Sequence, residues 1–69
     1  MLPPTPKQLI IEDFIGQFIA EHRYSPTIKE LAEHFGKSDP TMKAILDRME
    51  ARGRIKRVRG IARTIELAR

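Results

Sequence analysis

The 69-residue sequence contains no cysteine, which removes two ways of stabilising a small fold. Neither a disulfide framework nor a cysteine-ligated zinc finger can form. The sequence also has no run of 18 apolar residues, so a membrane-spanning helix is not expected. Its first residues, MLPPTPKQ, have neither the basic start nor the apolar middle of a secretory signal. These absences favour one small domain, residues 1–69, in a reducing cytoplasm.

Groups suited to catalysis or metal binding are scarce. The two histidines, His22 and His34, fall in different predicted elements and lack metal-ligand spacing to carboxylates. The only serines are Ser25 and Ser38, at positions typical of turn and cap residues. The glycines are isolated and form no phosphate-cradling loop. We therefore predict a protein that is not an enzyme and that needs no cofactor or metal.

Charge is distributed unevenly along the chain. Residues 1–35 hold three Lys or Arg and five Asp or Glu, a net charge of −2. Residues 36–69 hold ten Lys or Arg and four Asp or Glu, a net charge of +6. Such a one-sided basic region is typical of proteins that bind a polyanion, most often nucleic acid. The alternative interpretation is a solvated surface that only keeps the protein soluble.

Capping residues and apolar spacing predict a first helix. Thr5 and Gln8 have the spacing of a capping box, while Pro3 and Pro4 keep the preceding chain extended. Glu12 is expected mostly on the solvent side. The apolar face of this helix is predicted from its three- and four-residue spacing to contain Ile10, Ile11, Phe14, Ile15, Phe18 and Ile19.

A second helix is predicted after Thr27. Thr27 and Glu30 form another capping box. The apolar residues that follow repeat at helical spacing as far as Phe35, and Gly36 suits the left-handed residue that ends many helices. A tight turn of three or four residues is then expected before the next helix.

The third predicted helix covers residues 38–52 and closes at Gly53. Ser38 or Asp39 caps its start, and its buried face is expected to contain Met42, Ile45, Leu46 and Met49. Two short helices around a tight turn form the helix-turn-helix pattern, whose second helix reads base edges in the major groove. The residues available to DNA on the opposite face are Ser38, Pro40, Thr41, Lys43, Ala44 and Asp47.

Each of these side chains suits a particular contact. Ser38 and Thr41 can reach bases or phosphates, Lys43 can donate to guanine, and Asp47 can accept from cytosine. Ala44 can lie against a thymine methyl group. Structural interpretations stay open beside these, with Ser38 as a helix cap alone and Asp47 as a solvated acid.

After Gly53 the spacing indicates two short strands. They are expected to contain Ile55, Val58, Ile61, Ile65 and Leu67, with the link over residues 59–62 holding the permissive Gly60. Five cations crowd around this hairpin and repel one another unless a polyanion or counterions neutralise them: Arg54, Lys56, Arg57, Arg59 and Arg63.

We interpret the hairpin as a wing that touches the DNA backbone or minor groove. Its predicted DNA contacts are Arg57, Arg59 and Arg63. Arg57 is predicted to bind phosphate on every sequence alike. A solvated strand surface is the alternative. The predicted fold is mainly α with a small β-hairpin, a three-helix winged helix-turn-helix.

The stretches SPTIKELAEHFG, TMKAILDRMEARGRI and RGIARTIEL resemble the DNA-binding domain of the LexA repressor family. The opening TPKQ also matches, so the resemblance extends from Thr5 to Leu67. It implies a winged helix-turn-helix that binds operator DNA and represses transcription, usually as a two-fold dimer on a palindromic site.

The resemblance also carries over to individual positions. Ser38 falls on the serine that opens the family's recognition helix, while Gly60 and Arg63 match the glycine and arginine of the wing. Some family members have Asn-Ala and, one residue later, Glu-Glu at the base-reading positions. Here those positions hold Pro40, Thr41, Lys43 and Ala44. Two carboxylates are lost and the preceding turn is one residue shorter, so a different operator is expected.

LexA repressors continue into a peptidase domain with a Ser/Lys dyad, which also holds the dimer together. The present sequence stops at Arg69, so self-cleavage is not expected of it. An excised domain and a stand-alone regulator of a phage or mobile element both fit. The expected partner is double-stranded DNA in the bacterial cytoplasm, at the nucleoid, bound as a monomer or a weak homodimer.

Two other functions stay open. One is a winged helix that binds an acidic protein partner, as an adaptor or anti-repressor. The other is a non-specific DNA- or RNA-binding protein.

Overall fold

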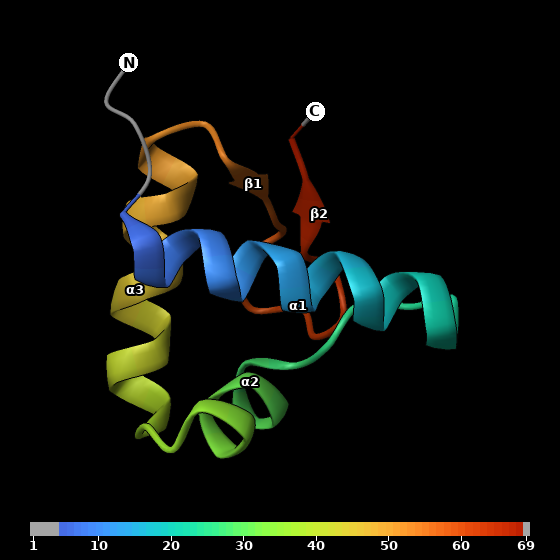
Figure 1. Cartoon of the computed structure of the whole chain (residues 1–69), viewed down its shortest axis with the longest axis horizontal. Coiled ribbons are helices and arrows are strands. Elements are labelled where there is room, and N and C mark those ends of the chain that lie inside the picture. Colours follow the sequence, from blue (N-terminus) through green and yellow to red (C-terminus); the bar gives the residue numbers. More distant parts are fainter. Residues whose placement is uncertain (1–4, 69) are drawn as a thin grey trace.

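The computed structural model describes residues 5–68, so the extended start predicted at Pro3 and Pro4 lies outside its range. Three helices are followed by a two-stranded antiparallel hairpin that stands beside α1 and α3 (Figure 1). The elements are α1 (Pro6–His22), α2 (Ile28–Phe35), α3 (Asp39–Ala51), β1 (Ile55–Lys56) and β2 (Glu66–Leu67). The predicted winged helix-turn-helix is confirmed. Within the described range, no helix has the length and apolarity that crossing a membrane requires.

Both predicted capping boxes are present. The Thr5 hydroxyl accepts from the Gln8 N–H at 3.2 Å, and the Gln8 side chain accepts from the Thr5 N–H at 3.4 Å. At α2, Thr27 and Glu30 make the same reciprocal pair at 3.0 and 2.9 Å. These bonds satisfy N–H groups that a helix start leaves without partners. The starts of α1 and α2 are therefore set by residues adjacent in sequence.

The turn between α2 and α3 has three residues, 36–38. Gly36 adopts a left-handed φ of +66°. The next N–H, of Lys37, donates to the Ala32 carbonyl at 2.8 Å and closes the end of α2. Ser38 then caps α3, because its Oγ accepts from the Thr41 N–H at 3.2 Å. This local bonding fixes the angle at which α3 leaves α2.

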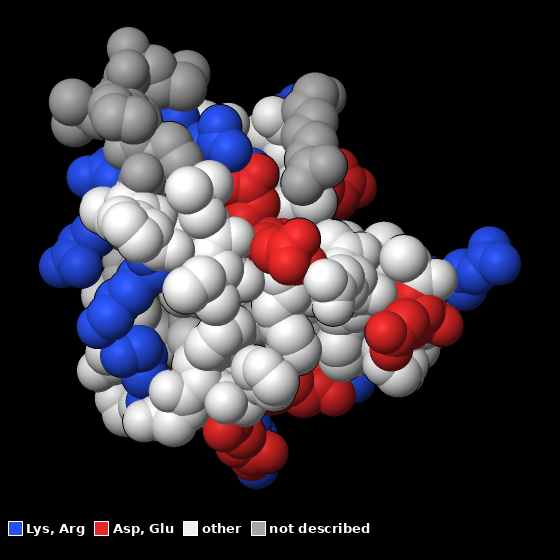
Figure 2. All heavy atoms as spheres, viewed as in Figure 1, with Lys and Arg blue, Asp and Glu red and all other residues white. Residues whose placement is uncertain are grey.

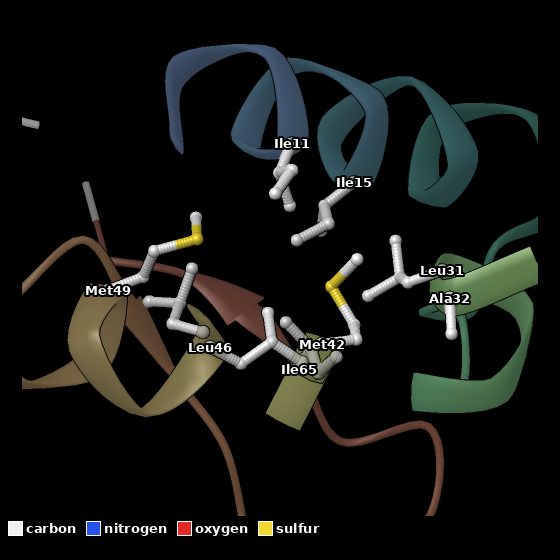
Figure 3. Close-up of a cluster of buried hydrophobic side chains, with 9 residues drawn as sticks. Ile11, Ile15, Leu31, Ala32, Met42, Leu46, Met49 and Ile65 are labelled. Carbon is white, nitrogen blue, oxygen red and sulfur yellow. The ribbon is translucent and has the colours of Figure 1, made fainter. Parts of the chain in front are cut away.

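A cluster of buried apolar side chains fills the space between the helices and the hairpin (Figure 3). Met42, Leu46 and Met49 of α3 are 0% exposed, which leaves the opposite side of α3 to solvent. The cluster consists of Ile11, Ile15, Leu31, Ala32, Met42, Leu46, Met49, Ile55 and Ile65. Removing one large side chain from such a core costs about 2–5 kcal/mol, so this packing holds α3 in place.

Two predictions for α1 are wrong. Ile10 is 59% exposed, because it lies about 100° around the helix from its neighbour Ile11, on which the buried stripe is centred. Glu12 was expected in solvent but is only 5% exposed. Its carboxylate accepts hydrogen bonds from Arg54 at 2.9–3.1 Å. A carboxylate is buried at tolerable cost only with such a partner.

The hairpin is shorter than predicted. Val58 and Ile61 do not lie in strands and are 54% and 62% exposed. The loop is held instead by Thr64, whose Oγ1 accepts from the Val58 N–H at 2.9 Å and lies 3.0 Å from the Ile61 carbonyl. Gly60 has a φ of +82°. We call residues 54–66 the wing. The paired residues are Ile55 with Leu67 and Lys56 with Glu66.

Candidate nucleic-acid interface

The start of α3 presents a polar face to solvent. The Ser38 hydroxyl donates to Thr41 Oγ1 at 2.8 Å, so the two hydroxyls form one unit at the helix start. Asp47, nearly two turns further along α3, is half-buried. The other residues predicted on α3 are all exposed around the first half of the helix: Ser38, Pro40, Thr41, Lys43 and Ala44.

Some cations near this face have no carboxylate partner. Lys29, Lys43 and Arg48 are exposed, and none forms an ion pair with another residue in the range 5–68. Lys and Arg side chains line the edge of the molecule formed by α3, whereas Asp and Glu lie mostly over α1 and α2 (Figure 2). The exposed start of α3 is thus a cationic surface with hydroxyl groups beside it.

Two of these cations were not predicted as site residues. Arg48 follows Thr41 by seven residues and Ala44 by four, a spacing that places all three on one side of a helix. That signal was available in the sequence. Lys29 belongs to α2, and only the fold brings it to the groove that Lys43 also lines.

A groove of about 360 Å³ lies between the start of α2, α3 and the wing. Lys29 and Lys43 line it from the helices, and Arg59 lines it from the wing. Its apolar lining comes from Pro26, Ile28, Val58, Ile61 and Ile65. A groove with cations at its sides and an apolar lining suits an extended anion that also has apolar segments.

Arg57 is turned toward α3 and away from solvent. Its side chain is 5% exposed, Nη2 pairs with Asp47, and Nε lies 3.3 Å from Glu50 Oε1. Burial, and secondarily the neighbouring Arg59, lower the pKa of Arg57, although a guanidinium stays charged at neutral pH. The phosphate contact predicted for Arg57 stays a prediction, and this position argues against it.

Arg59 shares the same two carboxylates but stays in solvent. Its Nη2 lies 3.4 Å from Asp47 Oδ1 and 3.5 Å from Glu50 Oε1, and its side chain is 64% exposed. Asp47, predicted to accept from cytosine, is therefore engaged with two arginines of the wing. We call Asp47, Glu50, Arg57 and Arg59 the α3–wing network.

Arg63 lies at the base of the wing with a left-handed φ of +60°. Its Nη1 donates to the Ser25 carbonyl at 3.1 Å and to Glu30 Oε1 at 3.0 Å, and its guanidinium lies 4.5 Å from the Tyr24 ring centroid. The Thr27 N–H, and secondarily Arg63, donate to the Glu30 carboxylate and lower its pKa. Arg63 thus joins the wing to the start of α2.

The chain is similar to known proteins over its whole length. A family model described as the LexA DNA binding domain matches residues 1–64. The chain belongs to the LexA DNA-binding domain family. It is also similar to the LexA repressor of Koribacter versatilis (strain Ellin345), with 36% identity over 70 residues. That match covers 100% of this chain and 33% of the relative, so the chain spans about a third of the relative's length.

In this LexA-family domain, four of the five cations crowded around the hairpin are neutralised by carboxylates of the same chain, without a polyanion. Arg54 pairs with α1, Arg63 with α2, and Arg57 and Arg59 with α3. Lys56 is exposed and forms no ion pair with another described residue. The carboxylates come from helices that precede the wing, so the positive charge offered by the wing is smaller than its sequence suggests.

Potential metal ligands do not gather in the described part of the LexA-family domain. Across residues 5–68, no three His, Asp or Glu side chains come close enough to hold a metal ion together. The chemistry that the described surface offers is therefore charge, hydroxyl groups and apolar contact.

Proposed function

We propose that this LexA-family domain binds duplex DNA sequence-specifically and represses transcription by occupying a promoter. The observation that carries the proposal is the exposed side of α3, where Lys43 in its first half and Arg48 in its last turn have no carboxylate partner in the described chain. An α-helix fits the major groove and reads base edges mainly with its N-terminal half. The repressor name of the Koribacter relative supports the regulatory role.

Within α3, we assign base reading to Thr41, Lys43 and Ala44. All three are exposed: Ala44 lies opposite the buried methionines, and Thr41 and Lys43 lie on either side of it. The Ser38 hydroxyl caps the helix and bonds to Thr41, so its first role is to orient the helix start. Pro40 supplies a rigid, exposed first turn that lets a DNA backbone approach.

The groove between α3 and the wing suits the backbone of one DNA strand. Lys29 supplies a cation to phosphates, and Val58 and Ile61 supply apolar surface to the sugars. Contacts of this kind fix the orientation of a protein on DNA without reading sequence. With these contacts, we propose that α3 lies in the major groove and the wing over the neighbouring backbone or minor groove.

The first test is selection from a random duplex library at near-physiological salt, followed by sequencing. An enriched motif supports sequence-specific readout, and one half-site or two in inverted repeat reports whether a monomer or a homodimer binds. Binding without enrichment would contradict the proposal in favour of a non-specific binder. No binding would favour a protein partner.

A matched pair of variants locates the interface. Lys43→Gln removes a charge from the start of α3, whereas Arg23→Gln removes one from the far end of α1, away from α3 (Figure 1). Lys43→Gln is expected to weaken binding to the enriched duplex, measured by fluorescence anisotropy, while Arg23→Gln leaves it near that of the parent protein. Equal weakening by both variants would place the interface elsewhere.

A further inference from the structure

We infer that the carboxylates of Asp47 and Glu50 on α3 hold Arg59 of the wing away from DNA, so that a phosphate must compete with them for its guanidinium. The inference rests on the proposed DNA binding. It gives the α3–wing network a role in setting affinity, and it assigns Asp47 a task other than reading a base.

The network contains two arginines in different situations. Arg57 is 5% exposed and pairs with both carboxylates, so it is fixed in the junction between α3 and the wing. Arg59 is 64% exposed and reaches the same carboxylates only through Nη2, at 3.4 and 3.5 Å. Burial holds the first guanidinium in place, whereas the second is free to change partners.

The geometry of Arg59 favours exchange. Well-formed bonds between a guanidinium and a carboxylate are about 2.7–2.9 Å long, and both of its contacts are longer than that. Exposed ion pairs of this kind contribute little to stability. A DNA phosphate offers more acceptor oxygens and a bidentate geometry that suits arginine. The groove lined by Arg59 also contains Lys29 and Lys43, so a phosphate attracted there arrives beside it.

The position of Asp47 in α3 supports the same conclusion. Lys43 lies one turn before it, at a spacing that favours an ion pair. No such pair forms, because Asp47 is taken by Arg57 and Arg59. To accept from a cytosine, Asp47 would have to leave a buried guanidinium. Its carboxylate therefore acts on DNA binding through the wing.

The test uses Asp47→Asn, with Glu50→Gln as a second variant in case the first weakens the fold. Each leaves the two arginines a single carboxylate to share, so Arg59 loses one of its two contacts and is held less firmly. Both are expected to bind the enriched duplex and an unrelated duplex about two- to fivefold more tightly. The gain is small because breaking an exposed ion pair costs only a small free energy. The slope of log K against log salt should become more negative by about 0.9, one extra phosphate contact.

A double-mutant cycle separates this mechanism from simple loss of negative charge. In an Arg59→Gln background, Asp47→Asn should give no gain in affinity, because the arginine it would release is absent. Asp39→Asn, at the exposed first turn of the same helix, is the control for removing a carboxylate that no described cation pairs with. It should leave the salt slope unchanged.

The outcomes distinguish the inference from the proposed function. If the parent protein enriches no motif, the proposed function fails and the inference falls with it. If it enriches a motif but Asp47→Asn loses affinity at one base pair only, Asp47 reads a base and the inference is overturned. An unchanged affinity, or an equal gain without Arg59, would also overturn it. Circular dichroism at the binding temperature verifies that each variant is folded.

Discussion

The start of α3 and the wing differ in how much of their positive charge is left for a partner. Residues 38–44 hold one lysine, whereas residues 54–66 hold five Lys or Arg. At the start of α3, Lys43 is exposed and has no carboxylate partner among the described residues. In the wing, four arginines are paired with carboxylates of the three helices. Net charge in a stretch of sequence is therefore a poor measure of the charge available to a partner.

Within residues 5–68, Lys43 has no carboxylate partner because the wing arginines compete with it for Asp47. Lys43 lies four residues from both Asp39 and Asp47, a spacing that favours pairing in an isolated helix. The wing arginines take Asp47 because a planar guanidinium can bond two carboxylates at once. Lys43 is left free for another partner. The pairing within the wing thereby helps to define the cationic surface on α3.

The largest effect is expected from Arg57→Ala, which tests whether this arginine is structural. Removing it leaves two partly buried carboxylates without their closest cation, and the free energy of unfolding should fall by about 2 kcal/mol. Urea unfolding measures the loss, with Lys56→Ala, an exposed neighbouring cation, as the near-neutral control. Unchanged stability together with a shallower salt slope for DNA binding would support the predicted contact between Arg57 and a phosphate.

A slightly smaller effect is expected from Lys43→Ala, on specificity rather than stability. Loss of one base-reading contact should cost about 1–2 kcal/mol at a single base pair of the enriched site and little at the others. Affinities for a set of single-base variants of that site would measure this. Lys29→Ala is the matched comparison, because a backbone contact should weaken all of them alike. If Lys43→Ala lost the same affinity on every duplex, Lys43 would not be a base-reading residue.

Most of the helical scaffold follows from residues close together in sequence. Thr5 with Gln8 and Thr27 with Glu30 are three residues apart, and the structure contains both capping boxes as predicted. The buried stripe of α3 was likewise predicted from helical spacing. Such features depend on a single helix and its first turn, so local rules suffice for them.

The arrangement of the wing could not be predicted in the same way. Arg54 bonds a glutamate 42 residues earlier, and Arg63 bonds one 33 residues earlier. No periodicity links residues so far apart, and the pairs form only after α1 and α2 have packed. The short hairpin, with only two paired residues in each strand, could not be predicted either. Its loop is held by hydrogen bonds of the Thr64 side chain in place of further pairing between the strands.

Ser38→Ala, at the start of α3, should have a moderate effect on stability. Loss of the cap leaves the Thr41 N–H without its acceptor, at a cost of about 1 kcal/mol in unfolding free energy. Ser38→Asp keeps an acceptor at the cap, so thermal denaturation should show a stability close to that of the parent protein. Its added negative charge should nevertheless weaken DNA binding. Unimpaired binding by Ser38→Asp would place the DNA away from the helix start.

The smallest effect concerns Glu30, which holds Arg63 at the base of the wing. Its pKa is lowered by the Thr27 N–H and by Arg63, so its carboxylate stabilises the folded state above the ordinary glutamate pKa of about 4.3. That contribution is lost as the pH falls through the lowered value. Glu30→Gln should therefore have a lower melting temperature than the parent protein at pH 7, and the gap should narrow near pH 3. A gap of equal size at both pH values would show that the hydrogen bonds of this side chain matter and its charge does not. The wing would then be held at its base by hydrogen-bond geometry, in contrast to the ion pairs that tie it to α3.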